Sequence, residues 1–554
     1  MSYSNYNFGW VTKDARKFLS RGYLPKNQTL EERYKYITDK LDERSGIKGF
    51  SAKVYEYCAN GWISFATPAL INYGHGDNLP ASCNYSSIED SMDGIFSTLY
   101  ETANLAKYGA GTAVNFSHIR PIGSNISTGG CSNGAVPWVK LYEEAINKVS
   151  QGNSRRGFLT SYLKADHKDI TDFLDIGMPN NDIQHITTGV VFPRGYMQEM
   201  LNGDKNKREV YAKVLKRRSE IGFPYILFED NAHENIPNPL RSRTKRIIDT
   251  SNICTEVLGD VDPVSETFVC VLSSVNLLYY DQWKNTDLIY DLRIILDLFT
   301  QEYIDKARGR KGFDRAVKYI EEHRSVGLGV LGWHSYLQSK MIPIGSLQAF
   351  SLNNEIFSLL RSECDRANMW MAEKWGEAPY CKGFGLRGDL SIAIAPTKST
   401  SFIMGGVSSG IEPIKSNYHE KVLAKIQSEY KNPELVKLLQ SLDKDTEDVW
   451  DSIGKNNGSV QHLDFLTKHQ KDVFKTFSEV SQLDLIKLAA QRQKYIDQSQ
   501  SLNLMIHPDT PPKDVSKLIL TAWEEGIKTL YYQYSINAAQ QFSKELLECS
   551  NCEG

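Results

Sequence analysis

The stretch FVCVLSSVNL (Phe268–Leu277) has the composition of a buried β-strand, with valine and leucine on both faces of the expected pleat. Two shorter runs of the same kind, TAVNF (Thr112–Phe116) and ITTGVVF (Ile186–Phe192), stand upstream of it. Amphipathic stretches separate such runs, for example MDGIFSTLYETANLAKY (Met92–Tyr108). Strands that alternate with helices predict an α/β fold with a largely parallel sheet.

The regions on either side of this core differ from it in amino-acid composition. Residues 1–66 are rich in charge and helix formers, which predicts a small N-terminal helical region. The main α/β region is predicted to span residues 67–533. Residues 534–554 are polar, end in ECSNCEG, and are predicted to be a flexible tail. The 554 residues exceed the roughly 250–300 that one compact core usually holds, so several domains or one large barrel are expected.

Composition excludes several classes of protein. The formal net charge is -3, without the clustered basic excess that a nucleic-acid groove or an anionic membrane surface requires. The N-terminus lacks the pattern of a secretory signal, and no apolar run approaches the ~20 residues of a membrane span. We therefore expect a cytoplasmic protein that binds neither nucleic acid nor membrane.

Nine cysteines are spread along the chain. In a reducing compartment a disulfide is more often catalytic than structural. Cys83 and Cys270 each lie near a predicted strand, where a lone cysteine is commonly just a small buried apolar residue. Cys549 and Cys552 form a single CxxC pair without the two further ligands that zinc requires, so we expect an exposed dithiol and no metal site.

The heptapeptide SNICTEV places Asn252, Cys254 and Glu256 two residues apart. On a β-strand their side chains would share one face, offering a thiol between an amide and a carboxylate. Such a cluster suits abstraction of a hydrogen by the thiol and movement of a proton by the carboxylate. The alternative is a loop with ordinary polar residues and a core cysteine.

Three further motifs carry weaker signals. The adjacent Tyr531 and Tyr532 are either packing residues or carriers of a radical. APTKSTSF (Ala395–Phe402) is typical of a turn that opens a helix and holds a phosphate, although a plain capping turn has the same composition. GLGVLG (Gly327–Gly332) matches GxGxxG but follows a charged helical stretch, so close packing is the better interpretation than dinucleotide binding.

Taken together, the chain from about Thr67 onward resembles the large subunit of class I ribonucleotide reductases. The similarity rests on the joint order of many short motifs: TPAL, SC at 82–83, GAGTAV, SQGNSRRG, SNICTE, FVCVLSSVNL, HRSVGLGVLG, APTKSTS, SGIEP, DQSQSLNL, KTLYYQ and the CxxC tail. The resemblance implies a ten-stranded α/β barrel made of two antiparallel halves, with the radical cysteine at the tip of a central loop. This placement conflicts with a strand at Cys254, and we favour the loop.

The resemblance also implies roles for the cysteines and their neighbours. Cys254 corresponds to the thiyl radical that abstracts the 3′-hydrogen of the ribose, Glu256 to the base for the 3′-hydroxyl, and Asn252 to its hydrogen-bonding partner. Cys83 and Cys270 correspond to the pair that becomes a disulfide. Cys549 and Cys552 correspond to the shuttle that reduces it and is recharged by thioredoxin or glutaredoxin. Tyr531 and Tyr532 correspond to the end of a radical path.

Substrate and effector positions follow from the same resemblance. The substrate positions are Thr67, Ser82, Gly111, Pro396, Thr397, Lys398, Ser399 and Thr400. The site for a nucleoside triphosphate that sets specificity maps onto Asp90, Arg120, and Ser150 and Arg155 in the loop 150–157. No cofactor is expected in this chain, because the radical would come from the metal cofactor of a separate small subunit. A homodimer is expected. Because Cys83 comes early in the chain, the family's N-terminal ATP cone is expected to be absent.

Two other functions compete with this interpretation. A class II reductase, which takes its radical from adenosylcobalamin, needs no second protein and has no need of the Tyr531–Tyr532 pair. A redox adaptor that uses only the CxxC tail would leave Asn252, Cys254 and Glu256 unexplained.

Overall fold

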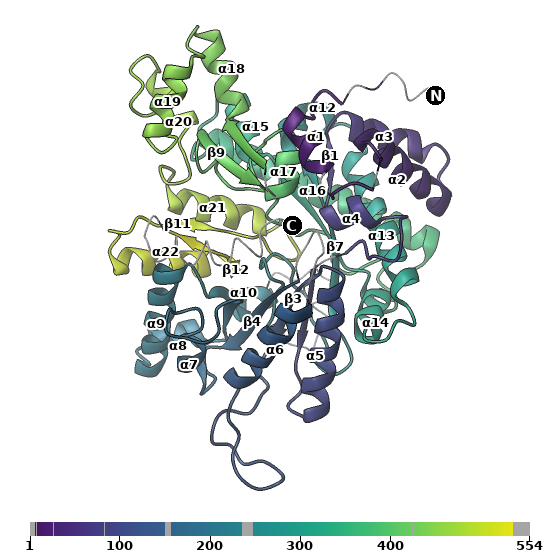
Figure 1. Cartoon of the computed structure of the whole chain (residues 1–554), viewed down its shortest axis with the longest axis vertical. Helices are drawn as coiled ribbons and strands as arrows, with labels where there is room; N and C mark the ends of the chain where they lie inside the picture. The colour runs from purple at the N-terminus through teal and green to yellow at the C-terminus, as the bar shows by residue number, and fades with distance from the viewer. Residues whose placement is uncertain are drawn as a thin grey trace.

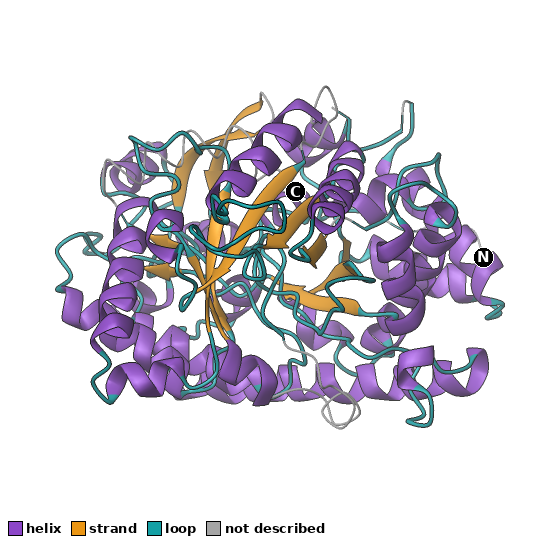
Figure 2. Cartoon of the chain, turned by 90° about the horizontal axis from the view of Figure 1, so that it is seen from below, coloured by secondary structure: helices purple, strands orange, loops and turns teal. Residues whose placement is uncertain are grey.

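The computed structural model describes residues 6, 8–20, 22–25, 27–81, 83–149, 157–234, 248–423 and 426–535, with no account of the side chains of 420–428. Strands lie at the centre and helices surround them (Figure 2). Within the described residues, no helix is both long and apolar enough to cross a membrane.

The first half of the central sheet is parallel throughout. Its strands occur in the order β2-β3-β4-β5-β6, and each is paired in parallel with the next. They span β2 (Cys83–Ser87), β3 (Gly111–Asn115), β4 (Phe158–Lys164), β5 (Thr187–Phe192) and β6 (Tyr225–Phe228). The predicted strands at 112–116 and 186–192 are thus confirmed within a residue.

The second half is also parallel but less regular. β7 (Phe268–Asn276) pairs with β8 (Val326–Leu331), and β11 (Leu504–Met505) pairs with β13 (Gln533–Tyr534). Between them, parallel bridges join 328 to 392 and 394 to 500. The segments 392–394, 500–505 and 529–534 therefore complete five strands with β7 and β8.

Two antiparallel contacts join the halves. β2 pairs with β7 at one junction, and β12 (Thr529–Leu530) pairs with β6 at the other. Five strands from each half thus close into the predicted ten-stranded α/β barrel. The short β1 (Ile63–Phe65) pairs with β7 in an antiparallel sense and is not one of the ten barrel strands.

Helices cover the outside of the barrel (Figure 1). Around the first half they are α5 (Met92–Lys107), α6 (Val136–Val149), α7 (Ile170–Phe173), α8 (Tyr196–Leu201), α9 (Lys205–Ile221), α10 (Glu229–Glu234) and α22 (Pro512–Glu524). Around the second half they are α12 (Tyr280–Trp283), α13 (Leu288–Ala307), α14 (Asp314–His323), α15 (Trp333–Ser339), α16 (Leu347–Trp375), α17 (Lys398–Ile403) and α21 (Gln482–Gln493).

The N-terminal residues are helical, as predicted. They form α1 (Lys13–Leu19), α2 (Leu30–Ser45), α3 (Phe50–Ala59) and, after β1, α4 (Thr67–Asn72). Thr29 and Glu32 form a capping box that fixes the start of α2. The core of this region is continuous with that of α13 and β7, so it packs on the second half. Whether residues 1–66, 67–533 and 534–554 are separate domains stays a prediction.

A helical insertion follows the segment after α17. It consists of the hairpin β9 (Tyr418–Leu423) and β10 (Ile426–Lys431), then α18 (Pro433–Ser441), α19 (Glu447–Lys455) and α20 (Lys468–Val473). It has a small core of its own around Trp450. It lies at the upper edge of the molecule in Figure 1, away from α5 and α6.

Close packing explains the glycines of β8. A Cβ atom on Gly327 would lie 2.2 Å from Leu272 Cδ2, and one on Gly329 would lie 2.8 Å from the Ala393 carbonyl oxygen. These glycines let β8 approach β7 and the segment 392–394. The interpretation of GLGVLG as a packing motif is therefore confirmed.

Candidate active site

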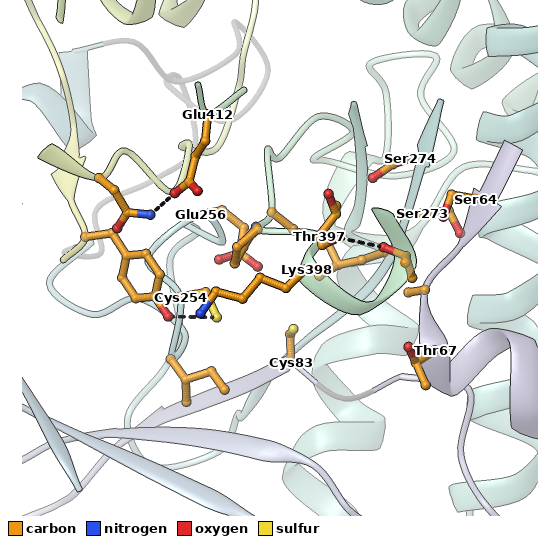
Figure 3. A pocket seen from close by; sticks show the side chains of 18 of the residues that line it. Ser64, Thr67, Cys83, Cys254, Glu256, Ser273, Ser274, Thr397, Lys398 and Glu412 are labelled. Atoms are coloured by element: carbon orange, nitrogen blue, oxygen red, sulfur yellow. Dashed lines mark hydrogen bonds between the residues drawn. The ribbon is translucent and has the colours of Figure 1, made fainter. Parts of the chain in front are cut away.

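A cavity of about 1050 Å³, including solvent at its mouth, lies where the two halves of the barrel meet. Figure 3 shows that its labelled residues come from several elements and point toward a common space. Polar and sulfur-bearing side chains that line it include Thr67, Cys83, Cys254, Glu256, Ser273, Thr397, Lys398, Glu412, Asn503, Tyr531 and Tyr532.

The central loop, residues 248–260, carries Cys254 through the middle of the barrel. It contains no strand, and Thr255 has a left-handed φ of 67°. The Ser251 hydroxyl donates to the Val257 carbonyl at 2.8 Å, and the Val257 N–H donates to Asn252 Oδ1 at 3.1 Å. These polar side chains bond the backbone of their own loop, so the strand interpretation of SNICTEV is wrong and the loop interpretation is confirmed.

Both halves of the barrel hold this loop. Tyr162 of β4 donates to the Asn252 carbonyl at 3.1 Å. Ser501 donates to the Cys254 carbonyl at 2.5 Å, and Thr529 donates to the Thr255 carbonyl at 2.8 Å. The position of Cys254 is therefore fixed by strands on opposite sides.

Glu256 is a buried carboxyl beside the cysteine. Burial raises its pKa to about 7, although the Asn252 side chain and the Ser501 hydroxyl favour the ionised form. The Ser501 Oγ lies 3.2 Å from Glu256 Oε2. A carboxyl with a pKa near neutrality can both accept and release a proton, as general acid–base chemistry requires.

Cys83 and Cys270 lie directly opposite each other in the register of β2 and β7. Opposite residues of an antiparallel pair have Cα atoms about 4.5–5.5 Å apart, which is within the span of a disulfide. Both cysteines are buried and neither is in a disulfide, and Cys83 lines the cavity. Burial, with the neighbouring Cys83 as a second cause, raises the pKa of Cys270 well above its usual value. The Cys270 thiol therefore stays protonated at neutral pH.

The tyrosine pair lies next to Cys254. The Tyr531 hydroxyl donates to the Cys254 sulfur at 3.5 Å, a contact drawn in Figure 3. The ring centres of Tyr531 and Tyr532 are 4.5 Å apart. Tyr531 is buried whereas Tyr532 is half-buried, so the pair leads outward from the sulfur.

Two more tyrosines extend this cluster, and neither was predicted from the sequence. The Tyr225 ring lies 4.7 Å from that of Tyr531 and 5.1 Å from that of Tyr532. The half-buried Tyr534 stacks on Tyr532 at 5.7 Å. Tyr534 could have been noticed from its place two residues after the pair, but only the β6 strand position brings Tyr225 here.

The turn before α17 contributes the polar wall of the cavity. Pro396, Thr397, Lys398 and Thr400 line it, and Figure 3 shows the Lys398 side chain extending from α17 into the space. The Thr397 hydroxyl oxygen accepts the Gly410 N–H at 2.8 Å, which fixes the turn. Ser399 is fully buried and does not line the cavity.

Hydroxyl groups without partners face the same space. Thr67 at the start of α4 and Ser273 of β7 both line the cavity, and neither hydroxyl oxygen makes a hydrogen bond within the described chain. Buried polar atoms normally have partners. These two hydroxyls are therefore suited to a polar ligand.

Gly111 lies beside the cavity and not on its wall. A Cβ atom there would lie 2.3 Å from Ile253 Cδ1 and collide with it. The missing side chain therefore leaves room for Ile253 of the central loop. Ile253 itself lines the cavity.

Asp90 and Arg120, the predicted effector residues, form an ion pair outside the cavity. Arg120 Nε donates to Asp90 Oδ2 at 2.7 Å. Asp90 directly precedes Ser91, the N-cap of α5, and Arg120 follows β3. Five other predicted site residues fall outside the described residues, namely Ser82, Ser150, Arg155, Cys549 and Cys552.

Comparisons with known proteins agree on one family. The family model for the ribonucleotide reductase barrel domain matches residues 81–207, 204–383 and 380–533. The ribonucleoside-diphosphate reductase large subunit of invertebrate iridescent virus 3 is 30% identical, with 93% of this chain and 92% of that protein covered.

Further relatives point the same way. A putative large subunit of frog virus 3 is 31% identical over 98% of this chain and 99% of its own length. The solved structure of the Actinobacillus ureae class Id ribonucleotide reductase alpha subunit is 43% identical, with a TM-score of 0.91 over 99% of this chain and 100% of that one. The barrel, the central cysteine and these similarities together show that the chain belongs to the ribonucleotide reductase family, as a large subunit of class I.

Proposed function

We propose that this chain reduces ribonucleoside diphosphates to 2′-deoxyribonucleotides in the cavity around Cys254. The observation that carries the proposal is the 3.5 Å contact between the Tyr531 hydroxyl and the Cys254 sulfur, beside a pair of opposed cysteines. A tyrosine can lose a proton and an electron together, and the thiol is placed to receive the radical. The barrel fixes this contact from both halves.

The radical chemistry begins at the sulfur. A thiyl radical at Cys254 removes the 3′-hydrogen of the ribose as an atom. Glu256, with its pKa near 7, accepts the proton of the 3′-hydroxyl, and Asn252 supports the carboxylate. This proton transfer weakens the bond to the 2′-hydroxyl.

The opposed cysteines supply the reducing equivalents. Cys83 lines the cavity and donates the proton with which the 2′-hydroxyl leaves as water. Cys83 and Cys270 then give up two electrons and two protons in total and form one disulfide, while Cys254 returns its hydrogen to the 3′-carbon. The balance is one ribonucleotide and two thiols in, and one deoxyribonucleotide, one water and one disulfide out.

The polar wall of the cavity holds the substrate. We assign the substrate phosphates to the turn Pro396–Thr400, where Lys398 supplies a positive charge. The hydroxyls of Thr67 and Ser273 are free to bind the nucleotide's polar groups. Of the other predicted substrate positions, Gly111 leaves room for Ile253, which lines the cavity. Ser82 lies outside the described residues.

Two protein partners follow from this chemistry. A separate small subunit, whose metal cofactor generates the radical, would deliver it through Tyr532 and Tyr531. Cys549 and Cys552 would reduce the Cys83–Cys270 disulfide by thiol exchange and be recharged by thioredoxin or glutaredoxin. This exchange requires the reducing compartment in which a cytoplasmic enzyme works.

The effector site is proposed to lie next to the interface of a homodimer. Met92, Phe96 and Tyr100 lie at four-residue spacing on α5 and are 60%, 46% and 54% exposed. Phe96 contacts Trp138 of α6, at a ring-centre distance of 6.1 Å. A second copy of the chain would cover this apolar face, and a nucleoside triphosphate beside Asp90 and Arg120 would then lie close to the dimer interface.

The test is a reduction assay with purified chain and a ribonucleoside diphosphate. Four mixtures are compared: chain alone, with a class I small subunit, with adenosylcobalamin, and with both. Product only with the small subunit supports the proposal. Product with adenosylcobalamin alone would replace it with class II chemistry.

A further inference from the structure

A buried histidine outside the candidate active site lies among carboxylates. His323, the last residue of α14, is fully buried, and its Nδ1 lies 2.7 Å from Asp389 Oδ2. Asp389 also accepts the Ser325 hydroxyl at 2.5 Å. The carboxylate is thus held on one side of the imidazole ring.

The other ring nitrogen has no such partner. His323 Nε2 is buried and makes no hydrogen bond to any described residue. The ring itself is clamped between Tyr319, at a ring-centre distance of 4.2 Å, and Tyr380, at 4.0 Å. A histidine that binds a metal usually gives its other N–H to a carboxylate, which fixes the tautomer and orients the ring. His323 has this arrangement.

Two more carboxylates face the open nitrogen. Glu266 Oε2 lies 4.0 Å from Nε2 and accepts the Asp262 N–H at 2.9 Å. Glu322 precedes the histidine in α14 and is only partly buried. One ligand atom from each of Glu266, Glu322 and His323 can be chosen so that all lie within 4.8 Å of one another.

This spacing is close to that of a metal site. Bonds of roughly 2.0–2.2 Å place two ligand atoms of one ion at most ~4.4 Å apart. A small rotation of the partly exposed Glu322 side chain would therefore bring the three atoms within bonding range.

Charge favours a cation at this position. Besides Asp389, Glu266 and Glu322, Asp260 lies on the same side and accepts the Tyr380 hydroxyl at 2.9 Å. Positive charge opposes them from two side chains. Lys318 donates to Ser265 Oγ at 2.7 Å and lies 3.9 Å from Glu266 Oε1, and the Arg315 guanidinium donates to the Glu266 carbonyl at 2.9 Å. The four carboxylates still outnumber these two cations, and one divalent ion would reduce the excess of negative charge.

We infer that Glu266, Glu322 and His323 bind one divalent transition-metal ion of the zinc class, with Asp389 orienting the histidine. The mixed nitrogen and oxygen ligands suit Zn²⁺ and Co²⁺. The ion would join α14 to the loop that leads from the central loop into β7, and so stabilise the strand that carries Cys270.

The test is a zinc titration of the full-length reduced chain, with a chromophoric chelator as competitor. Glu322→Gln removes one ligand at a partly exposed position, so the variant is expected to fold. Glu321→Gln is the matched control, because the neighbouring Glu321 pairs with Arg308 at 2.6 Å instead. The cysteines, which also bind zinc, are the same in all three proteins. We expect the wild type and the control to bind one equivalent more than Glu322→Gln, or to bind it at least tenfold more tightly.

A spectrum with Co²⁺ gives a second measurement. Nitrogen and oxygen ligands give weak visible d–d bands, whereas thiolates add strong near-ultraviolet charge transfer. We expect d–d bands that persist in Cys549→Ser/Cys552→Ser and are lost in Glu322→Gln. Equal zinc stoichiometry and affinity in Glu322→Gln and wild type would overturn the inference. In that case His323, whose pKa Asp389 raises against the effect of burial, is a cation paired with Asp389 and Glu266.

Discussion

The hydroxyl of Tyr531 lies 3.5 Å from the sulfur of Cys254, although 276 residues separate the two in the chain. Ser501 holds the carbonyl of Cys254 at 2.5 Å, and the Tyr531 N–H donates to the Leu502 carbonyl at 2.9 Å. The tyrosine and the cysteine are therefore fixed by adjacent residues of one strand segment. This common support keeps the hydroxyl and the sulfur together.

Tyr531→Phe should abolish deoxynucleotide formation and leave the fold intact. The variant loses one hydroxyl and keeps the ring, and a lost hydrogen bond typically costs about 0.5–1.5 kcal/mol of stability. Activity with the small subunit is measured beside circular dichroism and nucleotide binding. Near wild-type turnover would show that Tyr531 serves only in packing.

Glu256→Gln should be inactive and should change how stability depends on pH. Folding raises the pKa of Glu256 from 4.5 to about 7, so the folded state binds more protons than the unfolded state between these values. Wild-type stability should therefore fall as the pH rises from 4.5 to 7, by on the order of 3 kcal/mol from this group alone. The variant should lack that component.

The measurement for Glu256 is chemical denaturation of both proteins at pH 5 and pH 8. The free energy of unfolding of Glu256→Gln, relative to that of the wild type, should be larger at pH 8 than at pH 5. Wild-type activity should rise with pH through about 7, as the carboxylate forms. A stability difference that does not depend on pH would contradict the burial of an ionisable group at this position.

Features of this site that depend on neighbouring residues in the sequence could be predicted, whereas features that depend on distant segments could not. Valine-rich strands such as β5 and β7 were predictable because burial on both faces leaves continuous apolar runs. Asn252, Cys254 and Glu256 were identified, yet alternation suggested a strand. The left-handed Thr255 and the side-chain bonds of Ser251 to the loop backbone override that pattern.

Other features depend on contacts that no local pattern records. The register that sets Cys83 opposite Cys270 follows from strand pairing between distant segments. Gly111 lacks a side chain because Ile253 occupies that space, and nothing near Gly111 in the chain indicates it. The irregular strand at 392–394 is only three apolar residues long, and the one at 500–505 carries the polar residues Gln500, Ser501 and Asn503. Both are recognisable as strands only from their parallel bridges to distant segments of the barrel.

Cys549→Ser with Cys552→Ser should separate chemistry from rereduction. Prereduced protein should complete about one turnover per active site and then stall with thioredoxin, because a Cys83–Cys270 disulfide would lie in a buried junction. Dithiothreitol, which is small enough to diffuse into the cavity, should restore continued turnover. Steady turnover with thioredoxin would show that another route reduces the disulfide.

Arg120→Ala should weaken binding of the specificity effector. The guanidinium is anchored by Asp90 at 2.7 Å and by the Asn125 carbonyl at 3.1 Å, so it is preorganised for a phosphate. Calorimetric titration with a deoxynucleoside triphosphate should show at least a tenfold loss of affinity. Lys140→Ala, which removes an exposed pair with Asp182, is the control and should bind as the wild type does.

The antiparallel contact of β2 with β7 is one of the two junctions that join the half-barrels, and Cys83 and Cys270 both lie in it. Oxidation of this pair would convert a junction held by hydrogen bonds into a covalent cross-link between distant parts of the chain. Each catalytic cycle would then alternate between an open and a cross-linked topology of the same barrel. Resistance to unfolding would report the redox state of the enzyme, with the spent form the harder to unfold.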